Sequence, residues 1–463
     1  MRFPIKSLIA IGAFMLAGCS NEDAATIVPV EQAPTVFAKV QALHASPDAP
    51  LVNVMVDGVV ITAGADYMDA SAEGAGPPGT HSISVDAIMP GGDVEIFAPF
   101  DAALDADTVT TVVVSGPFDE LVANVYVQDD TAVAAGSARV FLVHADANVG
   151  FVDVYVTAPD ADLDASAPFA VDIGHEDSVE PTEFAAGVYE ITIMEEGETD
   201  SDFMYFNAFA TLEDGDDLTV VIVPNWQFER FGEDVPSPIV LVAMDANGAG
   251  ELHDANAPAL VSLTYLSSDT GPVVVVDEDD GPILFAEYPD TTGVCTAPAG
   301  DHSFSVESEG TLLEGDVSLE AASYSTVILD GLFAADDLAL NVFHDDNRSV
   351  ASYTKQRFYH GSPAIGDVDI YVVPTGDPIA DLDPTVEGVA FRDNTGYLLF
   401  DEGSYDIIVT ATGEKDELAS ITEYEAFDGY VDTWFIGDDE EGGTDYFFDG
   451  IPEDFETCFD EGP

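Results

Sequence analysis

Three histidines at matching points of the chain are the first candidates for chemistry. Each follows a short apolar run and precedes a turn, and they are His44, His144 and His360. A side chain that titrates near neutral pH can serve as a general base or as a metal ligand. The alternative is a hydrogen bond that closes the turn, for which Ser46-Pro47 is typical turn sequence. We favour the turn role, because the third copy of this pattern has Leu266 at the same point.

Two further histidines, His81 and His302, lie on stretches of alternating polarity. Tyrosine stands at the same place in the two other copies of the pattern, as Tyr189 and Tyr405. Packing of an aromatic ring explains this exchange, whereas a role as a ligand does not. We therefore expect these histidines to be structural.

Paired aspartates are the candidates for cation binding. The tetrapeptide Ala-Asp-Leu-Asp occurs at 161–164 and again at 380–383, at equivalent places in two copies. Carboxylate oxygens suit calcium, which is the one cofactor we consider. The candidate ligands are Asp162, Asp164, Asp381 and Asp383. Other acidic clusters lack the spacing of an EF-hand, and chance explains them in a chain with 90 acidic residues among 463.

Sequence motifs of well-known enzymes are missing from the chain. It contains no Gly-x-Ser-x-Gly, His-Glu-x-x-His, Walker or Cys-x-x-Cys pattern. We therefore expect no catalytic residue and no enzymatic activity.

Cysteine is sparse, and its role is open at this stage. Cys295 and Cys458 remain once Cys19 is assigned to the export signal described below. They either form a disulfide, which an exported protein permits, or stay as two buried free thiols.

Clustered aromatic residues also allow two interpretations. They gather at Trp226, Phe228 and Phe231, and again from Tyr446 to Phe448. Exposed rings would suit a sugar, whereas buried rings would pack in a core or a domain interface. We favour packing.

The elements that hold these residues form four copies of one pattern. Each copy begins with an apolar run, a turn and an alternating strand, as in Val40–Asp48 followed by Val52–Gly58. Each continues with a glycine turn into a second alternating strand, at Gly79, Gly187, Gly300 and Gly403. The two markers lie closer together in copies one and three than in copies two and four. This spacing indicates that a two-domain unit, short then long, was duplicated.

Alternation with period two predicts strands with one buried and one solvated face. We therefore expect an all-β protein: four tandem antiparallel β-sandwich domains, immunoglobulin-like in the loose sense, after a lipoprotein signal peptide. The expected boundaries are 1–18 for the signal peptide, 19–35 for a lipidated tether, 36–134, 137–255, 256–350 and 351–463 for repeats 1 to 4, with repeat 3 degenerate and repeat 4 ending in an acidic tail.

The N-terminus is typical of an exported lipoprotein. An apolar core from Leu8 to Leu16 follows two basic residues and is too short to span a bilayer. Leu16-Ala17-Gly18-Cys19 resembles a lipobox, in which the cysteine is acylated. By resemblance to the enterobacterial sorting rule, Ser20 favours the outer membrane; the periplasmic face and the cell surface both stay open. We expect the lipid on Cys19 to be the membrane anchor.

The charge balance restricts the partners. Removing the two basic residues of the signal leaves 8 basic against 90 acidic residues, a net charge of about −82. Such a protein repels nucleic acid and anionic headgroups. The acids are spread along the whole chain, which favours a solvated surface adapted to salt over a dedicated cation-binding role.

The segment His44-Ala-Ser-Pro-Asp-Ala-Pro, with the following Val-x-Val-x-Val-Asp-Gly and the later glycine-led strand, resembles the family catalogued as domain of unknown function 4397. The resemblance extends to repeats 2 and 4, while repeat 3 lacks the histidine and the proline. It implies tandem β-sandwiches in the bacterial envelope and no known activity, cofactor or catalytic residue. We expect a spacer or a display and binding scaffold; the alternative is a module that binds a polysaccharide or another envelope polymer, assisted by calcium. An envelope protein is a further candidate partner.

Overall fold

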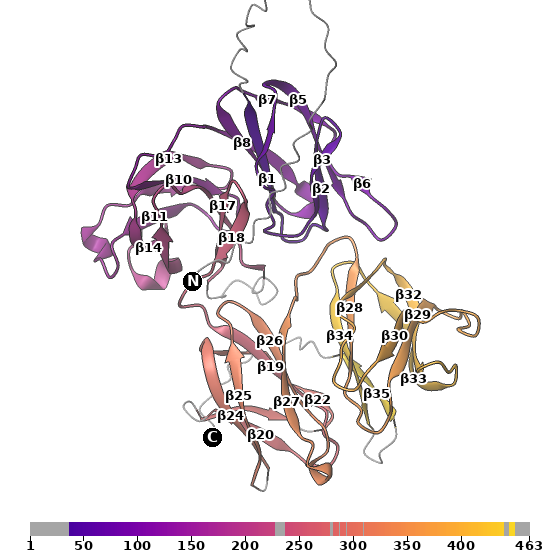
Figure 1. Cartoon of the computed structure of the whole chain (residues 1–463). Helices are drawn as coiled ribbons and strands as arrows, with labels where there is room; N and C mark the ends of the chain where they lie inside the picture. The colour runs from indigo at the N-terminus through magenta and orange to yellow at the C-terminus, as the bar shows by residue number, and fades with distance from the viewer. Residues whose placement is uncertain are drawn as a thin grey trace, which may run out of the picture. The chain divides into compact units, whose positions relative to one another are not determined.

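The computed structural model describes residues 37–226, 237–277, 281–286, 288–292, 294–308, 310–438 and 444–449. These residues belong to one compact unit, Phe37–Pro463. They form strands and short 3-10 turns, so the all-β prediction is confirmed (Figure 1). Within these ranges, no helix is long and apolar enough to cross a membrane. The predictions for Cys19, Cys458, Phe228 and Phe231 lie outside the described residues, as do those for the side chains of Cys295 and of Tyr446 to Phe448.

Repeat 1 folds into two sheets that enclose an apolar core. Their strand orders are β4-β1-β8-β9 and β3-β2-β5-β6, with β7 also paired to β5. The elements are β1 (Ala38–Ala45), β2 (Val52–Val56), β3 (Val59–Ala65), β4 (Gly74–Gly76), β5 (Gly79–Ala87), β6 (Val94–Glu95), β7 (Phe100–Leu104), β8 (Thr108–Ser115), η1 (Phe118–Glu120) and β9 (Val122–Asp129).

Repeat 2 repeats this plan with one more strand in its first sheet. The orders are β13-β10-β16-β17-β18 and β12-β11-β14-β15. The elements are β10 (Ser137–His144), β11 (Val152–Thr157), η2 (Leu163–Ala165), β12 (Ala170–Ile173), β13 (Ser178–Ala185), β14 (Gly187–Glu195), η3 (Ser201–Phe203), β15 (Met204–Leu212), β16 (Asp217–Pro224), β17 (Ile239–Asp245) and β18 (Gly248–Leu252).

Repeat 3 is degenerate in sequence but keeps both sheets. The orders are β22-β19-β26-β27, with β23 also paired to β19, and β21-β20-β24-β25. The elements are β19 (Ala259–Tyr265), β20 (Val273–Asp277), β21 (Gly281–Ala286), β22 (Asp290–Thr291), β23 (Cys295–Ala297), β24 (Gly300–Glu307), β25 (Thr311–Leu319), β26 (Tyr324–Asp330), η4 (Phe333–Ala335) and β27 (Ala339–Asp345).

Repeat 4 has two four-stranded sheets, with orders β31-β28-β34-β35 and β30-β29-β32-β33. The elements are β28 (Thr354–His360), β29 (Val368–Pro374), β30 (Val386–Val389), β31 (Leu398–Phe400), β32 (Gly403–Ala411), β33 (Glu417–Ala426), β34 (Val431–Asp438) and β35 (Thr444–Asp449). No described strand crosses one of the boundaries predicted between the repeats.

Each sandwich contains one parallel strand pair, which the prediction of antiparallel sheets did not include. The pairs are β1 with β8, β10 with β16, β19 with β26, and β28 with β34. A parallel pair needs a long crossover connection rather than a tight hairpin. Here the chain supplies that connection by building the whole second sheet between the two paired strands.

The first sheet of repeat 1 carries apolar side chains on both faces, as strand β1 shows. Ala38, Val40 and Ala42 point into the core of repeat 1. Leu43 and Ala45 belong to a different cluster, which also contains residues of repeat 2. A strand buried on both faces has a continuous apolar sequence instead of an alternating one. This double burial explains the apolar runs that begin repeats 1 to 3, whereas β28 of repeat 4 is equally buried but begins with polar residues.

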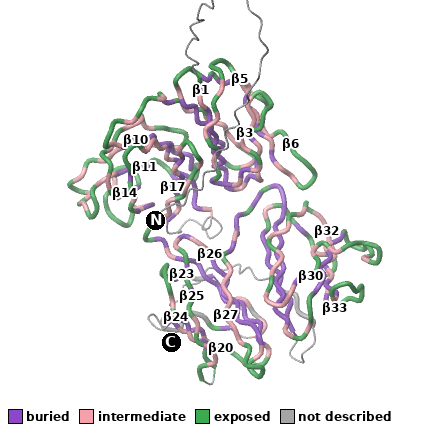
Figure 2. Tube along the Cα trace, viewed as in Figure 1, coloured by how far each residue is buried: buried purple, intermediate pink, exposed green. Residues whose placement is uncertain are grey.

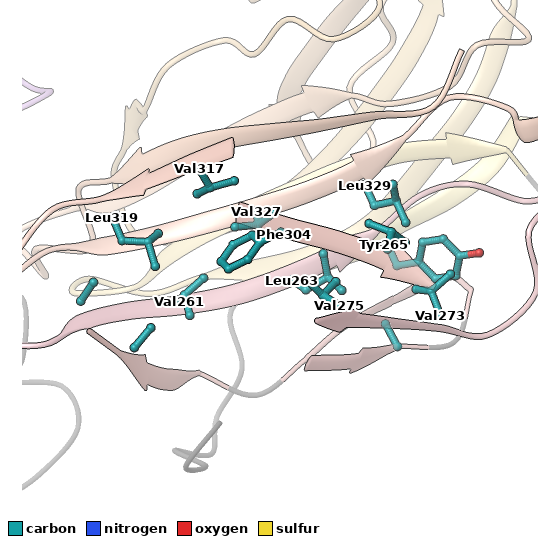
Figure 3. Close-up of a cluster of buried hydrophobic side chains, with 14 residues drawn as sticks. Val261, Leu263, Tyr265, Val273, Val275, Phe304, Val317, Leu319, Val327 and Leu329 are labelled. Atoms are coloured by element: carbon teal, nitrogen blue, oxygen red, sulfur yellow. The ribbon is translucent and has the colours of Figure 1, made fainter. Parts of the chain in front are cut away.

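The core of repeat 3 shows the usual alternation. Val261, Leu263 and Tyr265 come from β19, and they pack against Phe304 of β24 and Val327 of β26 (Figure 3). All five side chains are at most 2% exposed. The burial map shows the same buried strand segments and exposed loops in every repeat (Figure 2).

Two pairs of repeats share apolar clusters, and they use the same positions. Repeats 1 and 2 contribute Ala45, Val113, Val143 and Val221 to one cluster. The equivalent residues of repeats 3 and 4 are Leu266, Ile328, Tyr359 and Phe435, which form the other cluster. This correspondence agrees with a duplicated two-domain unit.

Candidate functional site

The three repeat histidines close turns inside the fold. The Nε2 atoms of His44, His144 and His360 lie 3.0, 3.2 and 3.0 Å from the carbonyl oxygens of Pro50, Gly150 and Gly366. Each Nδ1 accepts the backbone N–H of the residue two positions later, at 3.2 to 3.4 Å. Because a carbonyl only accepts and an N–H only donates, each ring is neutral with its proton on Nε2. Both nitrogens are therefore engaged by the backbone.

Tyr265 takes this role in repeat 3, so the alignment that placed Leu266 there was wrong by one residue. Tyr265 pairs with Leu329 in the parallel ladder, as His44 pairs with Val114. Its hydroxyl donates to the carbonyl of Gly271 at 2.6 Å. The acceptor is again six residues after the ring. Leu266 is instead the counterpart of Ala45 in the cluster between repeats.

Burial keeps the histidines uncharged. Loss of solvent lowers the pKa of His44 and of His144 to about 4, and it also lowers the pKa of His360. The three side chains are at most 1% exposed. Near neutral pH they are therefore uncharged structural groups.

The second set of histidines binds the backbone as well. His81 and His302 lie 2.9 and 2.7 Å from the carbonyl oxygens of Pro77 and Pro298. Tyr189 and Tyr405 donate to the carbonyl four residues before them in the same way, at 2.8 and 3.0 Å. Packing, which was the expected reason for the exchange, is present too, since both tyrosines contact a phenylalanine ring. The shared hydrogen bond is the reason that the sequence pattern alone did not reveal.

The aspartates proposed as calcium ligands lie in loops held by protein contacts. Asp162 caps the η2 turn by accepting the backbone N–H of Asp164 at 3.2 Å. Asp164 accepts the hydroxyl of Thr199 at 2.6 Å. Among the described residues, no group of three or more His, Cys, Asp or Glu side chains could hold a metal ion. Calcium binding by Asp162 and Asp164, or by Asp381 and Asp383, stays a prediction.

Basic side chains in the described ranges are engaged inside the protein, and several lie at junctions between repeats. Arg139 pairs with Asp217 and bonds Thr131 in the connection between repeats 1 and 2. Arg392 of repeat 4 pairs with Asp330 of repeat 3 at 2.7 Å. The remaining ones are Lys39, Arg348, Lys355 and Arg357, which pair with carboxylates, and Lys415, which bonds a tyrosine hydroxyl and a carbonyl.

Arg348 ties the connection between repeats 3 and 4 to repeat 1. Its Nη1 donates to the carbonyls of Pro47 and Ala49 at 3.0 and 2.8 Å, and its Nη2 pairs with Asp66. The backbone N–H of Ala351 adds a bond to the carbonyl of Asp48 at 2.8 Å. These bonds bring segments about 300 residues apart to one place.

A cleft of about 550 Å³ lies beside Arg348 and is the candidate functional site. Trp226 of repeat 2 and Tyr430 of repeat 4 line it, together with the polar residues Asp48, Asn148 and Asn347. Trp226 also packs against the cluster shared by repeats 1 and 2, so the packing interpretation holds for part of this ring. Trp226 was predicted from the aromatic residues near it in the sequence, whereas no sequence pattern predicted Tyr430 or Arg348 at this site.

Comparison with known proteins identifies the repeat. Residues 38–155 and 259–371 match the family model described as "Domain of unknown function (DUF4397)". The first segment covers repeat 1 and the start of repeat 2, and the second covers repeat 3 and the start of repeat 4, so the degenerate repeat is included. No curated protein matches the chain.

Two solved structures are similar only in part. "The Bacillus anthracis TIE protein" has 8% identity and a TM-score of 0.15, over 87% of this chain and 68% of that one. A structure described as "Alpha-glucan recognition by family 41 carbohydrate-binding modules from streptococcal virulence factors" has 10% identity and a TM-score of 0.16, over 40% of this chain and 93% of that one. At these scores neither likeness supports an inference about this chain.

Proposed function

We propose that this protein, a chain with tandem DUF4397 domains, is a non-enzymatic envelope lipoprotein whose β-sandwiches act as a stiff spacer or display scaffold. The observation that carries the proposal is the pairing of repeats through shared apolar clusters at equivalent positions. A hydrophobic interface between domains restricts their relative motion, whereas a polar one permits it. Stiff two-domain units suit a protein that must hold something away from a membrane.

The state of the histidines supports a role without catalysis. A general base needs a ring nitrogen free to take a proton from a substrate. The rings of His44, His144 and His360 have both nitrogens bonded to backbone and are buried. Their bonds stabilise turns, which supports a structural role.

Stiffness is the property that tests the scaffold role. We expect small-angle scattering of the delipidated protein to fit a narrow range of shapes. Replacing Leu266 and Tyr359 with serine should widen that range, because it weakens the cluster between repeats 3 and 4. Circular dichroism should still report folded strands, since Leu266 is outside the main core of repeat 3 and Tyr359 is outside the main core of repeat 4. Tyr265→Phe is the matched control within a single core. A wild-type protein that already scatters as freely jointed domains would contradict the scaffold role.

Release from the membrane tests the anchor. We expect Cys19→Ser to move folded protein from the membrane fraction to the soluble fraction, because the surface charge gives no attraction to anionic lipid. Ser20→Ala, which keeps the cysteine, should stay with membranes. Immunoblots of the two fractions give the measurement. A Cys19→Ser protein that still sediments with membranes would disprove lipid anchoring as the sole attachment.

Binding of an envelope polymer is the second candidate function. The cleft favours it, because Trp226 and Tyr430 line the same hollow as polar side chains. A scaffold and a polymer binder are compatible, since the sandwiches could hold the cleft in place.

A further inference from the structure

The tip of repeat 4 beside the cleft carries an exposed aromatic pair. Phe427 and Tyr430 lie in the turn between β33 and β34, and they are 51% and 53% exposed. Their ring centroids are 5.4 Å apart, with an angle of 45° between the ring planes. Large exposed rings that gather in one place mark a contact surface more often than single exposed side chains do.

The other repeats build the same turn without aromatic residues. Each turn has one residue with positive φ at the same position, namely Asp107, Gly215, Ala322 and Gly429. In each turn, the residue that follows the positive-φ residue donates a hydrogen bond. The acceptor is the carbonyl oxygen of the residue two positions before the positive-φ residue, at 2.7 to 3.2 Å. The pairs that correspond to Phe427 and Tyr430 are Asp105 with Thr108, Glu213 with Asp216, and Glu320 with Ser323. Turn geometry therefore does not require the two rings.

The position of Tyr430 assigns the rings to the cleft. Tyr430 lines the cleft, and Trp226 lines it from repeat 2. Asn148, Asn347 and Asp48 add amide and carboxylate groups to the same lining. Rings that offer an apolar face, next to groups that bond hydroxyls, match the chemistry of a sugar ring, which has an apolar C–H face and a polar edge.

The charge of the cleft and of the whole protein indicates whether the sugar is charged. Among the described residues that line the cleft, Arg348 is the one basic residue, and it is engaged by Asp66 and two carbonyl oxygens. The net charge of −80 repels an anionic polymer. We propose that the cleft and the Phe427–Tyr430 pair bind an uncharged polysaccharide. This inference rests on the polymer-binding candidate above and gives it a site and a ligand class.

Tryptophan fluorescence provides the test. The chain has two tryptophans, and Trp434 is 9% exposed with its Nε1 bonded to Gln356, so Trp226 is the reporter beside the cleft. The delipidated protein is titrated with dextran, a β-1,3-glucan, mannan and xylan, and with polygalacturonate as the anionic probe. We expect at least one uncharged glycan to change the emission and polygalacturonate to have no effect.

Substitutions taken from repeat 3 locate the site. Phe427→Glu with Tyr430→Ser reproduces the pair Glu320 and Ser323, so the turn should be preserved. We expect the double variant to bind the responding glycan about tenfold more weakly, as expected for the loss of two stacking rings. Phe209→Ala removes a ring that is 50% exposed on repeat 2 and should leave the affinity unchanged.

Three results would overturn the inference. They are no response to any of the four uncharged glycans, equal binding by the double variant, or equal binding of polygalacturonate. If the two rings instead bind an apolar protein segment, none of the uncharged glycans would change the emission. A hydrophobic dye would then bind the wild type and not the double variant. None of these results alters the scattering or fractionation experiments, so the scaffold proposal stands or falls separately.

Discussion

Acidification from pH 7 to pH 4 is expected to destabilise repeats 1 and 2 by about 3 kcal/mol for each buried histidine. The pKa of His44 and His144 is about 4 in the folded protein, against an ordinary value of 6.5. Between these values the unfolded chain binds a proton that the folded chain does not. The contribution of the two neutral histidines to the free energy of unfolding is therefore complete above pH 6.5 and is lost as the pH falls through 4.

Repeat 3, which has a tyrosine in place of the histidine, allows the effect of histidine protonation to be measured separately. Tyr265 makes the same type of bond in repeat 3 with a group that does not titrate in this range. We expect His144→Tyr to remove about 3 kcal/mol of the acid-dependent loss in repeat 2. Tyr265→His should introduce a similar loss in repeat 3.

The measurement is urea unfolding at pH 7, 5 and 4 in molar sodium chloride. Protonation of the many carboxylates also changes stability in this range, and high salt reduces that contribution by screening. Trp226 reports on repeat 2 when Trp434 is replaced by phenylalanine. Equal pH dependence in wild type and His144→Tyr would show that the buried histidine is not the cause.

Arg357→Met is expected to destabilise the junction between repeats 3 and 4 by about 3–5 kcal/mol. Arg357 pairs with Asp345, and the two side chains are 7% and 1% exposed. Removing the guanidinium takes the opposite charge away from a buried carboxylate that still accepts the Thr326 hydroxyl at 2.6 Å. A buried charge without its partner costs far more than the pair itself contributes.

An ion pair that is only partly buried serves as the matched control. Lys39 lies 2.8 Å from Asp130, with the two side chains 32% and 33% exposed, so Lys39→Met should cost less than about 1 kcal/mol. The double variant Arg357→Met with Asp345→Leu should regain part of the lost stability. Urea unfolding followed through Trp434, which lies on β34 of repeat 4, measures the two Arg357 variants, and Trp226, which packs against the cluster shared by repeats 1 and 2, reports on Lys39→Met. A loss no larger than that of the control would contradict the role of the buried pair.

The strands could be predicted from the sequence because period-two alternation is a direct sign of a half-buried sheet. The alignment of repeat 3 could not. Tyr265 and Leu266 are both large and apolar, so hydrophobicity does not distinguish the two registers, although a shift by one residue moves every side chain to the other face. The pairing of Tyr265 with Leu329 and the bond from Tyr265 to Gly271 identify the correct register.

The candidate site was harder to predict than the fold. Trp226 was identified as an aromatic residue near other aromatics, but Tyr430 and Arg348 come from distant parts of the chain. A cleft between repeats forms only where the apolar faces of particular repeats pack together. The sequence of a strand that is apolar on both faces does not indicate which repeat it packs against. Comparison of the four turns would have found Phe427 and Tyr430, because they replace acidic and hydroxyl residues of the other repeats.

The size of the side chains in the two shared clusters has a consequence for assembly. Four small residues, Ala45, Val113, Val143 and Val221, occupy the positions that hold larger ones in the second pair. The first cluster fills its volume with residues from other positions, including Phe141, Tyr67 and Met244. A repeat that met the wrong partner would leave voids or collide, and either outcome costs stability. When the chain folds from its N-terminus, this difference in shape would direct each sandwich to its own neighbour and away from the structurally equivalent repeat.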